Sequence, residues 1–376
     1  MREPDALILG GGILGLACAR QLARQGLSVT LLEAQADPTL KGSHSASWAA
    51  AGMLAPLVEA PEAGPLSAAA RASRDLWPQL VAELEAETRL AVEHDASGTL
   101  MVALDAAQEA HLEFLAAAAR RLGEPVLEVP AADLLRRVPD LKAPAHRALL
   151  LPGEQRVDNR QACRALERSV RDLGVEMLLG HRVLGVEATE SGVRVVGDGW
   201  QRSAPWLVVA AGAWSGRIPG LPALPVRPVK GEMIRLEGVD WPWSGVVRTP
   251  SAYAVRRGRS SLLVGATEEA VGFDTDTSPA GQRALLTMVA RLFPSLAGQA
   301  PAARWAGLRP GTPDRLPLLG SLAPPFQRVL LATGHYRHGI LLAPWTAQRI
   351  GDLVAGTEPD KTLDAFSPAR LHTPGC

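Results

Sequence analysis

The feature that most constrains the fold is a glycine-rich turn near the N-terminus, at residues 10–15. Residues 6–9 before it are continuously apolar, which is typical of a strand buried on both faces of a parallel sheet. Residues 16–25 after it predict a helix that stops at Gly26, and residues 27–32 predict a second strand. A strand, a glycine turn, a helix and a strand in this order predict an α/β fold.

The glycines are spaced as Gly-x-Gly-x-x-Gly, and each has a distinct physical purpose. Gly10 permits the tight turn, Gly12 lets a pyrophosphate approach the backbone, and Gly15 lets the helix pack on the strand. The helix N-terminus then offers free N–H groups to phosphate oxygens. Glu33 lies 18 residues past Gly15, where an acidic residue accepts a ribose hydroxyl. The unit therefore predicts a dinucleotide-binding, Rossmann-like domain.

The fingerprint by itself fits either NAD or FAD. Residues 329–332 form another apolar run that enters Gly334, a second strand-to-glycine unit able to return to a flavin. The chain contains no second Gly-x-Gly-x-x-Gly after a strand, so a separate NAD site is not indicated. These observations favour FAD, with a small molecule such as molecular oxygen as the electron acceptor.

Composition narrows the class of partner. Lys plus Arg and Asp plus Glu both number 39, and this balance argues against nucleic acid or an anionic membrane as the main partner. Cys18, Cys163 and Cys376 form no spaced motif, so no metal site is indicated and a reducing, cytoplasmic location is expected. The apolar stretch 6–19 is too short to span a bilayer, so no integral membrane contact is expected.

The order of segments predicts two interleaved domains. Buried, parallel-type strands lie at 6–9, 206–212 and 329–332, whereas residues 222–266 read as short strands joined by turns. A helix over 66–92 is expected to break at Pro78. We predict an FAD-binding domain from three segments with an inserted α+β substrate domain. The boundaries are 1–85, 152–221 and 303–376 for the FAD-binding domain, and 86–151 and 222–302 for the substrate-binding domain.

Four motifs make the chain similar to a known family. They are Ala-Ala-Ala-Gly-Met-Leu at 49–54, Pro-Val-Lys-Gly-Glu at 228–232, Trp-Ala-Gly-Leu-Arg-Pro-Gly-Thr at 305–312 and the stretch 334–344. From residue 6 to about residue 353, the chain resembles the glycine oxidases of the D-amino-acid oxidase-like FAD-dependent oxidoreductases. The resemblance implies oxidation of a small amino acid to its imine with oxygen reduced to hydrogen peroxide, a place in thiamine thiazole synthesis, and assembly as a homo-oligomer, often a tetramer.

The resemblance also implies which residues contact FAD, in addition to the glycine turn and Glu33. Those in the N-terminal half and middle are Ile13, Leu14, Ala34, Ala46, Ser47, Ala51, Gly52, Met53 and Val183. Those near the C-terminus are Gly334, His335, Tyr336, His338, Gly339, Ile340 and Leu341. No cysteine lies near residues 311–316, so non-covalent attachment is expected.

The resemblance places Arg337, Arg309 and Tyr253 at the substrate. A planar, permanently charged guanidinium suits a carboxylate, and a phenol can donate to it. Arg337 follows the end of a predicted strand, where open parallel sheets bind ligands. It is expected to be the main ligand of the substrate carboxylate, with Arg309 and Tyr253 assisting. The alternatives are a surface arginine for Arg337, a structural ion pair for Arg309 and a packing side chain for Tyr253. Lys230 is interpreted as support for a strand end rather than a base.

Three positions depart from the family pattern: Ser251 replaces histidine, Glu268 replaces methionine, and His338 replaces asparagine. Glu268 is either a site residue or a carboxylate turned to solvent. These departures leave open a sister D-amino-acid or secondary-amine (sarcosine-like) oxidase or dehydrogenase, and a flavin-binding sensor without turnover.

Overall fold

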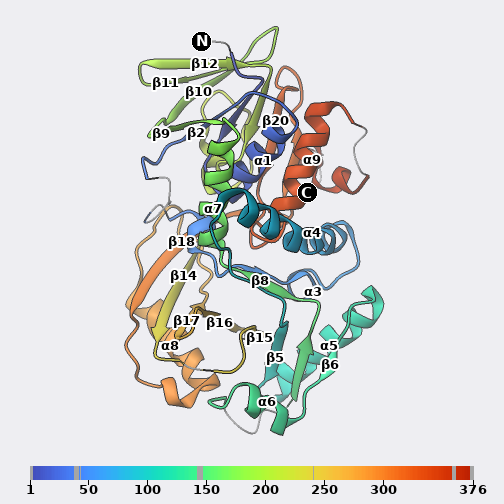
Figure 1. Ribbon diagram of the computed structural model, residues 1–376, viewed down its shortest axis with the longest axis vertical. Helices are drawn as coiled ribbons and strands as arrows, with labels where there is room; N and C mark the ends of the chain where they lie inside the picture. Colours follow the sequence, from blue (N-terminus) through green and yellow to red (C-terminus); the bar gives the residue numbers. More distant parts are fainter. Residues whose placement is uncertain are drawn as a thin grey trace.

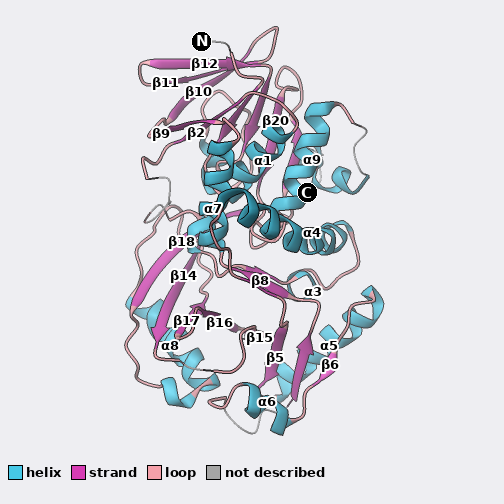
Figure 2. Cartoon of the chain, viewed as in Figure 1, coloured by secondary structure: helices cyan, strands magenta, loops and turns pink. Residues whose placement is uncertain are grey.

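The computed structural model describes residues 3–37, 42, 44–141, 147–239, 241–357 and 361–372, so Cys376 lies outside the described residues. Two large sheets form opposite halves of the molecule (Figure 1). The sheet that contains the N-terminal strand lies in the upper half of the view, and a longer mixed sheet lies below it. Helices cover the upper sheet and also flank the lower one (Figure 2).

The upper sheet has six strands in the order β19-β20-β13-β1-β2-β9. In that order their bounds are Leu318–Ser321, Val329–Thr333, Trp206–Val209, Ala6–Leu9, Val29–Glu33 and Glu176–Leu179. Neighbours are parallel except β19, which runs antiparallel to β20. The predicted α/β arrangement, with parallel strands from both ends and the middle of the chain, is confirmed.

Strand β1 shows why its sequence is apolar throughout. Ala6 and Ile8 pack in the core shared with the helices, whereas Leu7 and Leu9 pack in a second core on the opposite face. That second core includes Val193 from a three-stranded sheet, β10-β11-β12. The bounds of these strands are Val183–Ala188, Val193–Gly197 and Trp200–Ala204. Both faces of the strand are covered, so neither tolerates a polar side chain.

The lower sheet has eight strands in the order β18-β14-β17-β16-β15-β5-β7-β6. In that order their bounds are Ala303–Gly311, Arg227–Glu237, Ser261–Gly265, Ala252–Arg257, Val246–Thr249, Thr99–Ala103, Arg147–Leu151 and Leu127–Glu128. Neighbours are antiparallel except β15 and β5, which are parallel. A small sheet, β3-β8-β4, contains Met53–Leu54, Gln155–Val157 and His94–Asp95.

The helices divide between the two halves. Those associated with the upper sheet are α1 (Ile13–Arg24), α4 (Pro65–Thr88), α7 (Asn159–Asp172) and α9 (Ala343–Ala355). Those against the lower sheet are α5 (Ala106–Leu122), α6 (Ala131–Arg137) and α8 (Pro279–Leu292). Short helices α2 (Ala46–Ala49) and α3 (Pro56–Glu59) follow β2, and 3-10 turns occupy Gly212–Arg217, Pro294–Leu296, Lys361–Phe366 and Pro368–His372.

Two expectations need correction. Helix α4 runs without a break through Pro78, because Trp77 and Leu80 on either side of the proline are both buried in the upper core. Strand β18 pairs with β14 along nine register positions, so residues 303–311 belong to the lower sheet, although the predicted boundary assigns them to the FAD-binding domain. The remaining division into domains stays a prediction.

Within the described ranges, no helix is both long and apolar enough to cross a membrane. Across the same ranges, no group of three or more His, Cys, Asp and Glu side chains is placed to hold a metal ion.

Candidate active site

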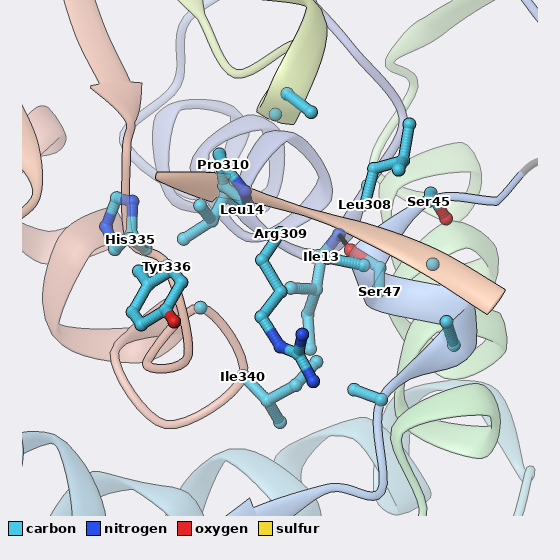
Figure 3. Close-up of a pocket in the computed structure, with 18 of the residues that line it drawn as sticks. Ile13, Leu14, Ser45, Ser47, Leu308, Arg309, Pro310, His335, Tyr336 and Ile340 are labelled. Carbon is cyan, nitrogen blue, oxygen red and sulfur yellow. Dashed lines mark hydrogen bonds between the residues drawn. The ribbon is translucent and has the colours of Figure 1, made fainter. Parts of the chain in front are cut away.

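A cavity of about 600 Å³ begins at the glycine turn and continues to the lower sheet. Its walls come from α1, α2, β18 and the loop between β20 and α9. In Figure 3, Arg309 extends from β18 into the space between Tyr336 and Ile340 on one side and Ser47 on the other. A cavity of this size and shape suits an elongated organic ligand.

The glycine turn has the geometry that a dinucleotide cradle needs. Gly10 has φ +108°, and a Cβ there would lie 2.5 Å from the carbonyl oxygen of Ala210. A Cβ on Gly15 would collide with the carbonyl oxygen of Gly10, so only glycine lets α1 start this close to the turn. The N–H of Ile13 donates to the hydroxyl of Ser47 at 3.0 Å, which ties α2 to the first turn of α1.

Glu33 lines the cavity at the end of β2 and also fastens the turn. One carboxylate oxygen accepts the N–H of Gly11 at 2.6 Å, and the other accepts the N–H of Gln35 at 2.7 Å. Each carboxylate oxygen has two lone pairs, so both retain capacity for a further donor such as a ribose hydroxyl. Cradle, acidic residue and cavity size together fit the adenosine and pyrophosphate parts of FAD.

Two glycines, one in the motif at 228–232 and one in the motif at 305–312, allow Arg309 to occupy the cavity. A Cβ on Gly231 of β14 would collide with its guanidinium, and a Cβ on Gly307 would collide with the side chain of Ala49 on α2. Nη1 of Arg309 donates to the carbonyl oxygens of Lys230 at 3.3 Å and Thr267 at 3.2 Å. Among the described residues, no carboxylate forms an ion pair with Arg309.

Arg337 has a different environment. It lies on the β20–α9 loop directly after Tyr336, whose φ of +50° is rare for a bulky side chain. Its Nη2 forms an ion pair with a carboxylate oxygen of Glu268, and its Nη1 lies 3.9 Å from Glu59. The side chains of Arg337 and Glu268 are 38% and 34% exposed. Of the two only Arg337 is among the described residues that line the cavity, so this pair, the mouth pair, lies at its solvent side.

Four further charged residues line the cavity and were not predicted from the sequence: Arg182, Arg217, Arg248 and Glu59. Arg248 on β15 and Glu59 at the end of α3 form an ion pair of 2.6 Å, with side chains only 9% and 13% exposed. Burial acts to raise the pKa of Glu59, but the charges of Arg248 and Arg337 bring it down to about 2. Arg248 could have been recognised in the sequence as a single charged residue in a short, otherwise uncharged strand. No sequence pattern distinguishes Glu59.

Tyr253 on β16 faces the same charges. Its hydroxyl donates to the sulfur of Met233 at 3.3 Å, and its ring lies 5.9 Å from the guanidinium of Arg248. Burial raises the pKa of Tyr253, although Arg309, Arg248 and Arg337 act to lower it. The phenol therefore stays protonated at neutral pH, and its proton can turn from the sulfur, a weak acceptor, to a stronger acceptor in the cavity.

Most of the residues predicted to form the site line this one cavity. Those at the cofactor end are Gly10, Gly12, Ile13, Leu14, Glu33, Ala34, Ala46, Ser47, Ala51, Gly52, Met53 and Val183. Those at the other end are Tyr253, Arg309, His335, Tyr336, Arg337, Gly339 and Ile340. Segments far apart in the chain are thus brought together as expected.

Four predicted cofactor residues support the cavity wall instead of lining it. Gly15 contacts the turn, and Gly334, with φ +72°, faces Thr312. The carbonyl oxygen of Leu341 accepts hydrogen bonds from Ser73 and Trp77 of α4. His338 is 5% exposed, and burial lowers its pKa, so the ring is neutral.

Ser251 and Lys230, which were also singled out in the sequence, differ in whether they line the cavity. Ser251 lines the cavity. Nζ of Lys230 points into a carboxylate cluster instead, 3.3 Å from Glu269, 3.4 Å from Asp274 and 3.6 Å from Glu232. Burial lowers the pKa of Lys230, but the Glu269 and Asp274 carboxylates outweigh this effect and raise it. A lysine held in this way is a permanent cation, as expected for structural support of β14.

The family model described as FAD dependent oxidoreductase matches residues 5–353. The chain belongs to this family. It is 35% identical to a glycine oxidase of Pseudomonas aeruginosa, over 96% of this chain and 98% of that protein. It is also 35% identical to the bifunctional protein ThiO/ThiG of Synechocystis, where the match covers 98% of this chain and 54% of the relative.

Comparison with solved structures agrees with the fold. The crystal structure of glycine oxidase from Geobacillus kaustophilus superposes with a TM-score of 0.91 at 31% identity, over 98% of this chain and 99% of that chain. The predicted α/β FAD-dependent oxidoreductase with an amino-acid-oxidase fold is thereby confirmed, and FAD is the cofactor of the family.

Proposed function

We propose that the chain oxidises glycine or another small amino acid to its imine, with molecular oxygen reduced to hydrogen peroxide. The observation that carries the proposal is Arg309, a cation with no carboxylate partner among the described residues, in a cavity continuous with the dinucleotide cradle. A substrate carboxylate is the ligand that this guanidinium lacks. The similarity to glycine oxidases supports glycine as the first substrate to test.

We propose that the glycine turn and Glu33 hold the nucleotide part of FAD and that the β20–α9 loop contacts the flavin ring. Ile13, Ile340 and Met53 supply apolar contacts in that cavity. FAD, when bound, supplies the redox chemistry by accepting two electrons from the substrate. No cysteine is among the described residues that line the cavity, which supports non-covalent attachment.

The substrate carboxylate is proposed to bind Arg309 and the phenol of Tyr253. Arg337, the main carboxylate ligand expected from the family resemblance, is already ion-paired with Glu268, so Arg309 is the stronger candidate. The reaction breaks a Cα–H bond and requires only that the amine be uncharged. The contribution of the chain is therefore placement of the substrate, a proximity effect, and a dry, charged environment.

The test is an anaerobic panel of amino acids that follows loss of the yellow flavin absorbance, followed by peroxide measurement in air. Glycine should bleach the flavin, and peroxide should form at the rate of turnover. Arg309→Ala should lower kcat/KM by on the order of 100-fold, a loss of about 3 kcal/mol of transition-state stabilisation, because a partner of a charged ligand is removed. Arg309→Lys should recover only part of the activity. FAD content should not change. Near-normal turnover by Arg309→Ala would exclude it as the carboxylate ligand.

We propose that the imine is released for thiamine thiazole synthesis, as the resemblance to glycine oxidases implies. A cytoplasmic location is supported by the sparse, unpatterned cysteines. A homo-oligomer, with the tetramer as first candidate, also follows from the resemblance and is measured directly by light scattering after size exclusion.

A further inference from the structure

The mouth pair is fixed to the same segment that contacts Arg309. The backbones of Lys230 and Glu269 are bridged in both directions, with N–H to oxygen distances of 2.9 and 3.0 Å. Within this bridged segment, the carbonyl oxygen of Thr267 accepts from Arg309, and the carboxylate of Glu268 binds Arg337. Thr267 and Glu268, which are adjacent in the chain, therefore each contact one of the two guanidiniums, and strand pairing holds Glu268 in place.

At the end of the cavity formed by the lower sheet and the β20–α9 loop, two of the three arginines have carboxylate partners. Arg248 is paired with Glu59, and Arg337 is paired with Glu268. Arg309 remains without a carboxylate among the described residues. One guanidinium is thus open at this end, which matches a substrate with a single carboxylate. The other two arginines that line the cavity belong to the upper half, since Arg182 precedes β10 and Arg217 ends the 3-10 turn after β13.

A second carboxylate on the substrate meets an obstacle. It must either remain unpaired in a partly buried site or displace Glu268 from Arg337, and both are unfavourable. Burial acts to raise the pKa of Glu268, but Tyr336, Arg337 and Arg315 lower it, so the carboxylate is ionised at neutral pH. Because the pair is already neutralised, Glu268 also offers no free charge to a cationic side chain.

We propose that Glu268 makes the cavity selective for amino acids with one carboxylate, by occupying Arg337 and so excluding amino dicarboxylates and N-carboxymethyl amino acids. The proposal rests on the proposed function for its substrate class. Where the family has methionine, Glu268 neutralises Arg337. Without Glu268, Arg337 is a second carboxylate-binding site in the same cavity.

The first experiment compares kcat/KM for iminodiacetate and glycine in the holoenzyme. Glu268→Gln should raise the ratio for iminodiacetate over glycine by about tenfold or more. The double variant Glu268→Gln/Arg337→Gln should lose this gain. Glu190→Gln, which removes an exposed carboxylate on the β10–β11 connection, should leave the ratio as in the unaltered chain. An unchanged ratio in Glu268→Gln would overturn the proposal.

The second experiment reads binding without turnover. Calorimetric titration with glutarate, a dicarboxylate of the same chain length as iminodiacetate, is compared with valerate, which has one carboxylate. Glu268→Gln should lower the Kd of glutarate about tenfold while valerate changes much less. Equal changes for both ligands would show general electrostatics and contradict the proposal. If glycine is not oxidised at all, the proposed function fails, and this binding comparison still decides the role of Glu268.

Discussion

At the scale of single residues, pairing determines which cavity cation is open to a ligand. Arg309 and Arg337 both reach the cavity, but only Arg337 has a carboxylate partner. Residue type alone does not separate them, since both are arginines within glycine-rich motifs. The difference arises from Gly231, which makes room for the Arg309 guanidinium, and from Glu268, which neutralises Arg337.

A residue-scale prediction concerns the cradle. Gly12→Val should abolish FAD retention, because a Cβ at Gly12 already lies 3.0 Å from the hydroxyl of Ser47 and the added methyls would occupy the cavity. Flavin absorbance per polypeptide after desalting measures the effect. Gly64→Val is the matched control, since a Cβ at Gly64 meets nothing within 4 Å. Full FAD content in Gly12→Val would contradict the assignment of the cradle.

At the scale of elements, one buried carboxyl holds the short helix that carries Glu59. Glu154, directly before β8, is 1% exposed, and its carboxylate oxygen accepts the N–H of Val58 in α3 at 3.0 Å. Burial raises its pKa to about 7, against opposing hydrogen bonds from Thr99 and Val58. The anchor of α3 is therefore a group that titrates near neutrality.

The raised pKa of Glu154 should make the free energy of unfolding depend on pH. The folded pKa of about 7 exceeds the ordinary glutamate pKa of 4.5, so the folded state retains a proton that the unfolded chain releases. Stability from this group is present below pH 4.5 and is lost as pH rises to 7, by up to about 3 kcal/mol. Urea unfolding at pH 5 and pH 7 should show a smaller decrease for Glu154→Gln than for the unaltered chain. Glu190→Gln should keep the original pH dependence; the same dependence in Glu154→Gln would refute the argument.

At the scale of the whole molecule, the cavity is assembled by contacts between the two halves. The indole N–H of Trp305 on β18 donates to the carbonyl oxygen of Ala49 on α2 at 3.0 Å. The N–H of Leu308 donates to the carbonyl oxygen of His44 at 2.9 Å. A ligand along this junction contacts both halves at once and stabilises the folded state as a unit.

The whole-molecule prediction is that FAD stabilises the fold by mass action without a covalent bond. Each tenfold rise in free FAD above its Kd should add about 1.4 kcal/mol and raise the thermal midpoint measured by calorimetry. Acid or heat should release the yellow cofactor into the supernatant. Gly12→Val should show no dependence on FAD. Flavin that stays with the denatured polypeptide would show covalent attachment instead.

Local sequence patterns determined the elements that depend on neighbours in the chain. The strand, turn, helix and second strand at the N-terminus follow from apolar periodicity and the φ freedom of Gly10, and all are present. Motifs in four separate segments indicated the family, and most of the site residues predicted from that resemblance line the cavity. These features are readable because each is encoded within a few consecutive residues.

Tertiary structure decided what depends on partners far away in the sequence. Strand β5 becomes central in the lower sheet only by pairing with β15, and Pro78 stays helical because the core holds both sides of α4. The pairing of Arg337 with Glu268, 69 residues apart, is equally invisible in the sequence. Charge neutralisation requires two side chains to meet in space. The sequence therefore identified Arg309 and Arg337 as cations of the site, and only the folded chain determined which of the two is open.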